Sequence, residues 1–162
     1  MTKVMASGVF DILHLGHVYF LEEAKKFGNK LAVVVACDAT VRKLKHEPIT
    51  PEKMRLEMVK ALKPVDEAYI GYEGDPYKIV AEIKPDIIAI GYDQHHDIEK
   101  IEKELSAHGL KIKVVRLPKH QDAFDLNGTR KIVGKIIEAY EFQKSIEKFE
   151  ACEKKEKSGA KK

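Results

Sequence analysis

Two histidines, His14 and His17, stand three residues apart in the stretch GVFDILHLGH, which directly follows a short apolar run. Gly8 at the end of that run would let the backbone approach a ligand closely, and Phe10 could pack below as the floor of a site. His17 falls in the first turn of a predicted helix, where backbone amides and the positive end of the helix dipole favour an anion. The spacing therefore predicts a phosphate site. The stretch has neither GxxxxGK(S/T) nor GxGxxG, which excludes a P-loop.

Zinc binding is a second interpretation of the histidine pair. Further ligands would have to come from Asp93, His95, His96 or His120, and no recognised zinc spacing links these residues to the pair. Two loop histidines without a shared role are a third interpretation. Both stay open here, while phosphate chemistry also accounts for the glycine before the pair and the helix after it.

The elements that must position these residues follow from alternating patterns along the chain. Strands are predicted at 3–7, 31–37, 65–70, 86–90 and 111–117. Helices are predicted at 17–27, from 38, from 50, at 76–83 and 97–108, and from 128 to the late 140s. Strict alternation favours a parallel sheet, because parallel strands require crossovers that cover both faces. The predicted fold class is α/β, a doubly wound five-stranded parallel sheet with ligands beyond the carboxyl ends of its strands.

Length and composition limit the classes of protein to consider. The 162 residues are 44% hydrophobic and 34% charged, which suits one soluble domain. The longest apolar stretches are far shorter than the ~20 residues that span a bilayer, so no membrane partner is expected. The first residues lack the apolar segment of a secretory signal, which favours a cytoplasmic protein. Cys37 and Cys152 stand far apart, which disfavours a disulfide framework.

A lysine-rich tail accounts for the net charge of +3. Residues 151–162 contain five lysines and two glutamates, so residues 1–150 are neutral by difference. Such a tail could touch RNA or an anionic surface, but a solvated, disordered end is the preferred interpretation, and no nucleic-acid partner is expected. The predicted organisation is one domain at 1–150 and a disordered tail at 151–162.

The segment GVFDILHLGH resembles the (T/G)xFDxxHxGH signature of the cytidylyltransferase-like nucleotidyltransferases, with Val9 where many members have threonine. Enzymes of this family join a nucleoside triphosphate to a phosphate-bearing acceptor and release pyrophosphate. The resemblance covers about residues 3–137 and implies the Rossmann-like fold of HIGH-type nucleotidyltransferases. It looks closest to the archaeal FAD synthases, through ACDATVRKLK (36–45), PEKMRLEMVKALKPVDEAYIG (51–71) and KPDIIAIGYDQ (84–94).

The resemblance also implies roles for individual residues. His14 and His17 would face the triphosphate, Lys45 and Arg55 would reach its phosphates, and Asp11 would brace the loop or a metal. A divalent cation such as magnesium is expected, with Asp11 and Asp93 as candidate ligands. The other expected nucleotide-binding residues are Gly8, Val9, Phe10, Asp11, Gly91, Asp93, Asn127, Thr129 and Arg130.

The segment LNGTR at 126–130 stands where the family has an ISTT or ISGT element. Asn127 replaces a serine there, and Arg130 adds a cation. The alternative interpretation of LNGT is a plain helix cap.

The main requirement of the expected reaction is the stabilisation of negative charge. A phosphate monoester is largely dianionic at neutral pH, so the acceptor needs no general base. Negative charge builds up as pyrophosphate leaves, and two imidazoles, Lys45, Arg55, a helix amino end and a metal would offset it. The chemistry requires no nucleophilic serine or cysteine.

The leading hypothesis is adenylyl transfer from ATP to FMN, which gives FAD and pyrophosphate, so ATP and FMN are the expected partners. Cytidylyl transfer to glycerol phosphate, phosphoethanolamine or a similar acceptor stays open, although the RTEGISTT element of those enzymes is missing. A nucleotide- or metal-binding module without catalysis is the alternative from another class, and a homodimer also stays open. Flavin binding would need an apolar slot, with candidates Phe124, Tyr72, Tyr77 and Tyr92.

Overall fold

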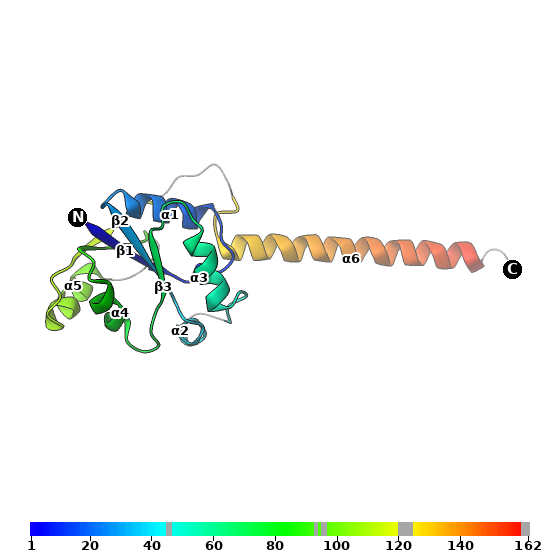
Figure 1. Ribbon diagram of the computed structural model, residues 1–162. Helices are drawn as coiled ribbons and strands as arrows, with labels where there is room; N and C mark the ends of the chain where they lie inside the picture. Colours follow the sequence, from blue (N-terminus) through cyan, green and yellow to red (C-terminus); the bar gives the residue numbers. More distant parts are fainter. Residues whose placement is uncertain (45–46, 93, 95–96, 120–124, 160–162) are drawn as a thin grey trace.

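The computed structural model describes residues 1–44, 47–92, 94, 97–119 and 125–159, with the backbone alone for 44 and 151–159. Five parallel strands form one sheet in the order β3-β2-β1-β4-β5 (Figure 1). This arrangement confirms the predicted doubly wound α/β fold. The strands are β1 (Lys3–Gly8), β2 (Lys30–Val35), β3 (Glu67–Ile70), β4 (Ile87–Ile90) and β5 (Lys113–Arg116).

The central strands are apolar on both faces because helices cover both sides of the sheet. Along β1 and β2, alternate residues enter two separate hydrophobic clusters: Val4 and Val33 belong to one, and Met5 and Val34 to the other. The helices that connect the strands are α1 (Leu15–Lys25), α2 (Asp38–Leu44), α3 (Glu52–Lys60), α4 (Pro76–Ile83) and α5 (Ile98–Ala107). The first cluster contains residues of α1 and α3, and the second contains residues of α4 and α5.

Local sequence explains where several helices begin. Asp75 accepts hydrogen bonds from the backbone N–H groups of Tyr77 and Lys78 at the start of α4, and Pro76 occupies the first helical position. Asp97 caps α5 in the same way. Helix α1 begins at Leu15 rather than at His17, because His14 already has the extended backbone of a residue that precedes a helix.

The strand order reverses between β1 and β4, which are hydrogen-bonded neighbours in the middle of the sheet. At such a switch point the loops after the two strands diverge and leave a crevice at the carboxyl edge of the sheet. The HxGH loop follows β1, and the Gly91–Gln94 turn follows β4. The fold therefore brings together the two segments that the sequence analysis selects.

The last helix, α6 (Thr129–Gly159), extends away from the rest of the molecule (Figure 1). It has 31 residues and continues about ten residues beyond the predicted end in the late 140s. In the described part of the chain, none of the helices combines the length and the apolar character that crossing a membrane requires.

Candidate active site

The loop after β1 has a backbone conformation that few side chains adopt. Phe10 and Ile12 have φ angles of 56° and 50°, in the left-handed region that is unfavourable for residues with a Cβ. Phe10 is 1% exposed, and a Cβ added to Gly8 would lie 3.0 Å from carbons of its ring. The ring thus lies beneath the end of β1, where the sequence analysis expects a floor.

His14 and His17 lie together at the amino end of α1. Their rings stack with centroids 3.8 Å apart and an interplanar angle of 21°, and the ring of His17 lies 5.2 Å from that of Phe10. The backbone N–H of His17 donates to the carbonyl of His14 at 3.0 Å. The two imidazoles therefore lie at the amino end of α1, which is the end of a helix that favours a bound anion.

The residue directly before His17 is glycine because another chain segment packs against it. A Cβ on Gly16 would lie 2.6 Å from the carbonyl oxygen of Asn127. Thr129 Oγ1 also donates to the carbonyl of Asp11 at 2.7 Å, so segment 126–129 packs on the HxGH loop. Thr129 is the first residue of α6, and Arg130 is exposed. The amino ends of α1 and α6 consequently meet, and both the helix-start and the nucleotide-binding interpretations of LNGT fit this placement.

Asp11 braces the HxGH loop against the loop before α3. Its carboxylate accepts from the backbone N–H groups of Ile49 (2.7 Å) and Thr50 (2.9 Å) and from the Thr50 hydroxyl (2.6 Å). Burial acts to raise the pKa of Asp11, but these hydrogen bonds and the nearby charge of Arg55 together hold it below its ordinary value. Both carboxylate oxygens accept hydrogen bonds from the loop before α3, an arrangement that fits the predicted brace of the HxGH loop.

Arg55 is placed differently from the sequence-based expectation that it reaches phosphates. Its side chain is 0% exposed and forms an ion pair with Asp38 at 2.5 Å. Its other guanidinium groups donate to the carbonyls of Val9 (2.5 Å) and Thr50 (3.0 Å). Val9 and Thr50 belong to the loops after β1 and before α3, and Asp38 is the first residue of α2, so Arg55 joins these three segments. Asp38, which the sequence analysis did not select, is its charged partner.

The turn after β4 is joined to β1 by Gln94. Its side-chain oxygen accepts from the N–H of Gly91 at 3.0 Å, and its amide donates to the carbonyl of Ser7 at 3.1 Å. Arg116 on β5 donates to the carbonyls of Gly91 (3.2 Å) and Gln94 (2.6 Å). Buried Gly91 is thereby fixed beside the end of β1. The signal that could have selected Gln94 is its position three residues after the glycine that follows β4.

The aromatic candidates for a flavin slot occupy different surroundings. Tyr77 donates to Glu104 and stacks on His108 at 4.7 Å, which places it between α4 and α5. Tyr72 donates to Glu82 of α4 at the far edge of the sheet. Tyr92, 49% exposed, directly follows Gly91 and is therefore the candidate of these three that lies at the site.

Several predicted residues lie outside the described part of the chain: Lys45, Asp93, His95, His96, His120 and Phe124. Within the described part, no three His, Cys, Asp or Glu side chains gather as metal ligands would.

Comparisons with known proteins agree with this geometry. The cytidylyltransferase-like family model matches residues 5–145. FAD synthases from Aciduliprofundum boonei and Methanobrevibacter ruminantium are each 57% identical, over 85% and 83% of this chain and 92% and 91% of their own lengths. A crystal structure described as a lipopolysaccharide core biosynthesis protein from Thermoplasma volcanium GSS1 superimposes with a TM-score of 0.73 at 49% identity, covering 75% of this chain and 99% of that one. With its HxGH loop at the switch point of the sheet, the chain belongs to the cytidylyltransferase-like family.

Proposed function

We propose that this protein is an FAD synthase, which transfers the adenylyl group of ATP to FMN and releases pyrophosphate. The observation that carries the proposal is the stacked pair of His14 and His17 at the amino end of α1, beside the β1–β4 switch point. The choice of ATP and FMN is supported by relatives named FAD synthase that are 57% identical over most of their length.

The transfer makes one P–O bond and breaks another. An oxygen of the FMN phosphate attacks the α-phosphorus of ATP, and the bond to the bridging oxygen breaks, so pyrophosphate leaves with the bonding electron pair. His14 and His17 donate hydrogen bonds to the phosphate oxygens, and the first N–H groups of α1 bind the same anion. These donors are fixed in advance, so they stabilise the leaving charge without rearranging.

Other residues of the site act by positioning. Asp11 and Arg55 hold the HxGH loop against the start of α2 and the loop before α3. Gln94 fixes the turn after β4 to the end of β1. A divalent cation would supply further neutralisation of the triphosphate.

The test is an assay of pyrophosphate release by the purified chain with a divalent cation. ATP with FMN should yield pyrophosphate and FAD in equal amounts, while CTP with glycerol phosphate should yield little. A preference for CTP and a small alcohol phosphate would overturn the FAD assignment and leave the roles of the two histidines intact. Absence of pyrophosphate from every pair of substrates would favour a binding module without catalysis.

A further inference from the structure

Asn127 and Gly128 form an asparagine–glycine pair directly before α6. A Cβ built on Gly128 would meet no atom within 4 Å, so no other segment crowds this residue. Its carbonyl accepts from the N–H groups of Lys131 (3.0 Å) and Ile132 (3.1 Å) in the first turn of α6. Its own N–H lies outside the helix. The Gly128 nitrogen is therefore able to approach the side chain of Asn127, which precedes it.

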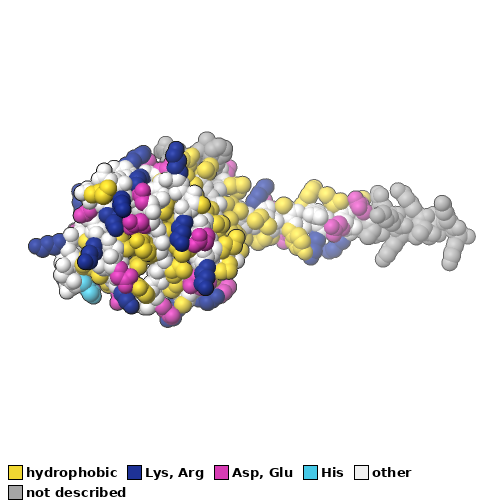
Figure 2. Space-filling model, viewed as in Figure 1, with side chains coloured by type: hydrophobic (Ala, Val, Ile, Leu, Met, Phe, Trp, Pro, Cys, Tyr) yellow, Lys and Arg dark blue, Asp and Glu magenta, His cyan; other side chains and the backbone are white. Residues whose placement is uncertain are grey.

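Lys131 makes the amide carbon of Asn127 easier to attack. Its Nζ donates to Asn127 Oδ1 at 3.1 Å. When a nucleophile adds to this carbon, negative charge develops on Oδ1, and an ammonium donor stabilises that charge. The neighbouring Leu126 and Arg130 are exposed, and Figure 2 shows α6 emerging at the surface of the molecule. Water consequently reaches this segment.

We propose that Asn127 is a site of spontaneous deamidation, which places a carboxylate beside the anion site. The Gly128 nitrogen loses its proton to hydroxide and attacks the side-chain carbon of Asn127. The amide nitrogen leaves with its bonding electron pair and takes a proton from water, so ammonia is released and a cyclic imide remains. Water then adds to the imide and opens it to aspartate or isoaspartate. The net reaction consumes water and releases ammonia, without an oxidant or a cofactor.

The modified residue lies at the amino end of α1. The Asn127 carbonyl oxygen is 2.6 Å from the position of a Cβ on Gly16, the residue before His17. A negative charge added here opposes the binding of a triphosphate at the same helix end. Isoaspartate also lengthens the backbone where it packs on Gly16. The modification itself is independent of the proposed function, whereas its effect on ATP rests on that function.

Asn29 is the other asparagine of the chain and provides an internal control. Its Oδ1 accepts from the N–H of Thr2 at 3.1 Å. The nitrogen that follows it, that of Lys30, donates to the carbonyl of Thr2 at 3.2 Å and belongs to the first residue of β2. Both groups that would have to react are thus held by Thr2, so Asn29 should remain intact.

The test is peptide mass spectrometry of the full chain after storage in mildly alkaline buffer. Trypsin releases residues 27–30 with Asn29 and residues 120–130 with Asn127. Deamidation replaces NH₂ by OH, and fragmentation assigns this change to a residue. Protein isoaspartyl methyltransferase labels the isoaspartate. We expect Asn127 to be modified about tenfold faster than Asn29, or more, because only Asn127 is followed by glycine.

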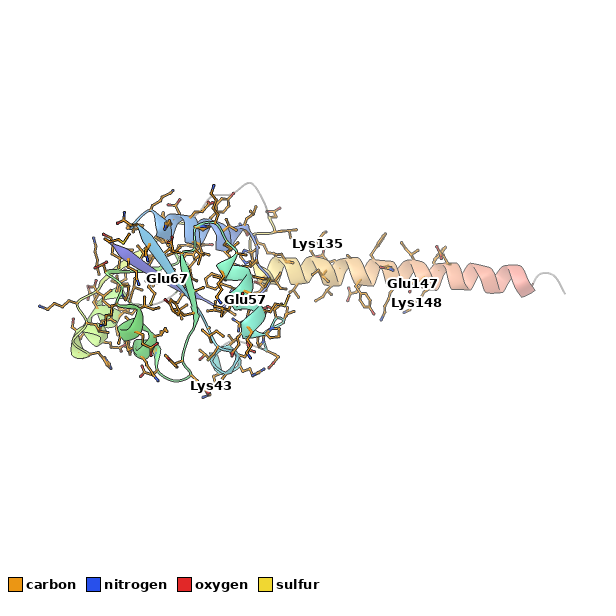
Figure 3. All side chains as sticks on the ribbon, in the orientation of Figure 1. Lys43, Glu57, Glu67, Lys135, Glu147 and Lys148 are labelled. Carbon is orange, nitrogen blue, oxygen red and sulfur yellow. The ribbon has the colours of Figure 1, made fainter. Side chains whose placement is uncertain are left out.

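Three variants test the chemistry at this site. Gly128→Ala should slow the modification by about tenfold or more, because the new methyl group hinders its own nitrogen, while the open space around it preserves the fold. Lys131→Met should slow it severalfold. Lys135→Met is the matched control, because Lys135 lies one helical turn further along α6 and pairs with Glu138 at 3.3 Å. Figure 3 labels Lys135 where α6 leaves the domain.

Asn127→Asp reproduces one product directly. It should raise the KM for ATP about tenfold and change kcat little. Stored wild-type chain should approach this KM as the modified fraction grows, while stored Gly128→Ala keeps its initial KM.

Equal rates at Asn127 and Asn29 would overturn the proposal. So would a Gly128→Ala chain modified as fast as the wild type, or a wild-type KM for ATP in Asn127→Asp. If no form of the chain makes FAD, the proposed function is refuted, and the peptide masses still decide whether Asn127 is modified.

Discussion

Replacing Arg55 distinguishes two possible roles of its side chain, which are binding phosphate and holding the segments around the site together. Arg55→Met removes the buried partner of Asp38 and leaves the carbonyls of Val9 and Thr50 without this donor. Removing one member of a buried ion pair costs about 3–5 kcal/mol. The Asp38 side chain retains 19% exposure, which places the expected loss near the lower end, at about 3 kcal/mol. For a chain of 162 residues this corresponds to a fall in melting temperature of roughly 10 °C.

The assay combines urea unfolding with steady-state kinetics. Arg55→Lys keeps the charge but has one donor group, so we expect an intermediate loss of stability, and kcat should fall together with it. A double-mutant cycle with Asp38→Asn should show a coupling energy, because the two side chains are in contact. The reasoning is refuted if Arg55→Lys unfolds like the wild type while its KM for ATP rises strongly, because that result indicates direct phosphate binding.

Four further changes test the site and the C-terminal tail. His17→Ala should lower kcat about a hundredfold with an unchanged melting temperature, whereas His108→Ala, at the residue after α5, should leave kcat unchanged; equal kcat values for the two variants would contradict the role assigned to His17. The stability due to Asp11 should be present above its ordinary pKa of 3.8 and be lost as the pH falls further, so urea unfolding of Asp11→Asn should depend less on pH below about 4 than that of the wild type. Gly16→Ala should lower the melting temperature, because its Cβ would lie 2.6 Å from a carbonyl oxygen; an unchanged value would contradict this packing. Deleting residues 151–162 should alter neither melting temperature nor turnover, since this segment has few apolar residues to bury.

The strands of the sheet could be predicted because a strand that is buried on both faces is apolar along its whole length. The run LAVVV of β2 is fully apolar, which distinguishes a covered parallel strand from one with a solvated face. The anion site could be predicted because a glycine, two histidines and a helix start are close in sequence. Local patterns of this kind do not depend on the rest of the chain.

The role of Arg55 could not be predicted in the same way. Within PEKMRLEMV it resembles any charged residue of an amphipathic helix, and its burial depends on Asp38 and Val9, which lie 17 and 46 residues away. The full length of α6 could not be predicted for another reason. Apolar residues become rare after Phe149, but lysine and glutamate are good helix formers, so the helix continues without a core to pack against.

The place of β1 in the middle of the sheet has a consequence during synthesis of the chain. Its first neighbour, β2, emerges early, because Lys3 pairs with Lys30. Its other neighbour is β4, and Val4 pairs with Ile87 only after more than half of the chain has been made. Ribosomes add about 5–20 residues per second, so the nascent chain presents an unpaired, apolar strand edge for several seconds. The chain is therefore most prone to aggregate before residue 90 has left the ribosome. The HxGH loop after β1 and the turn after β4 come together only at that stage.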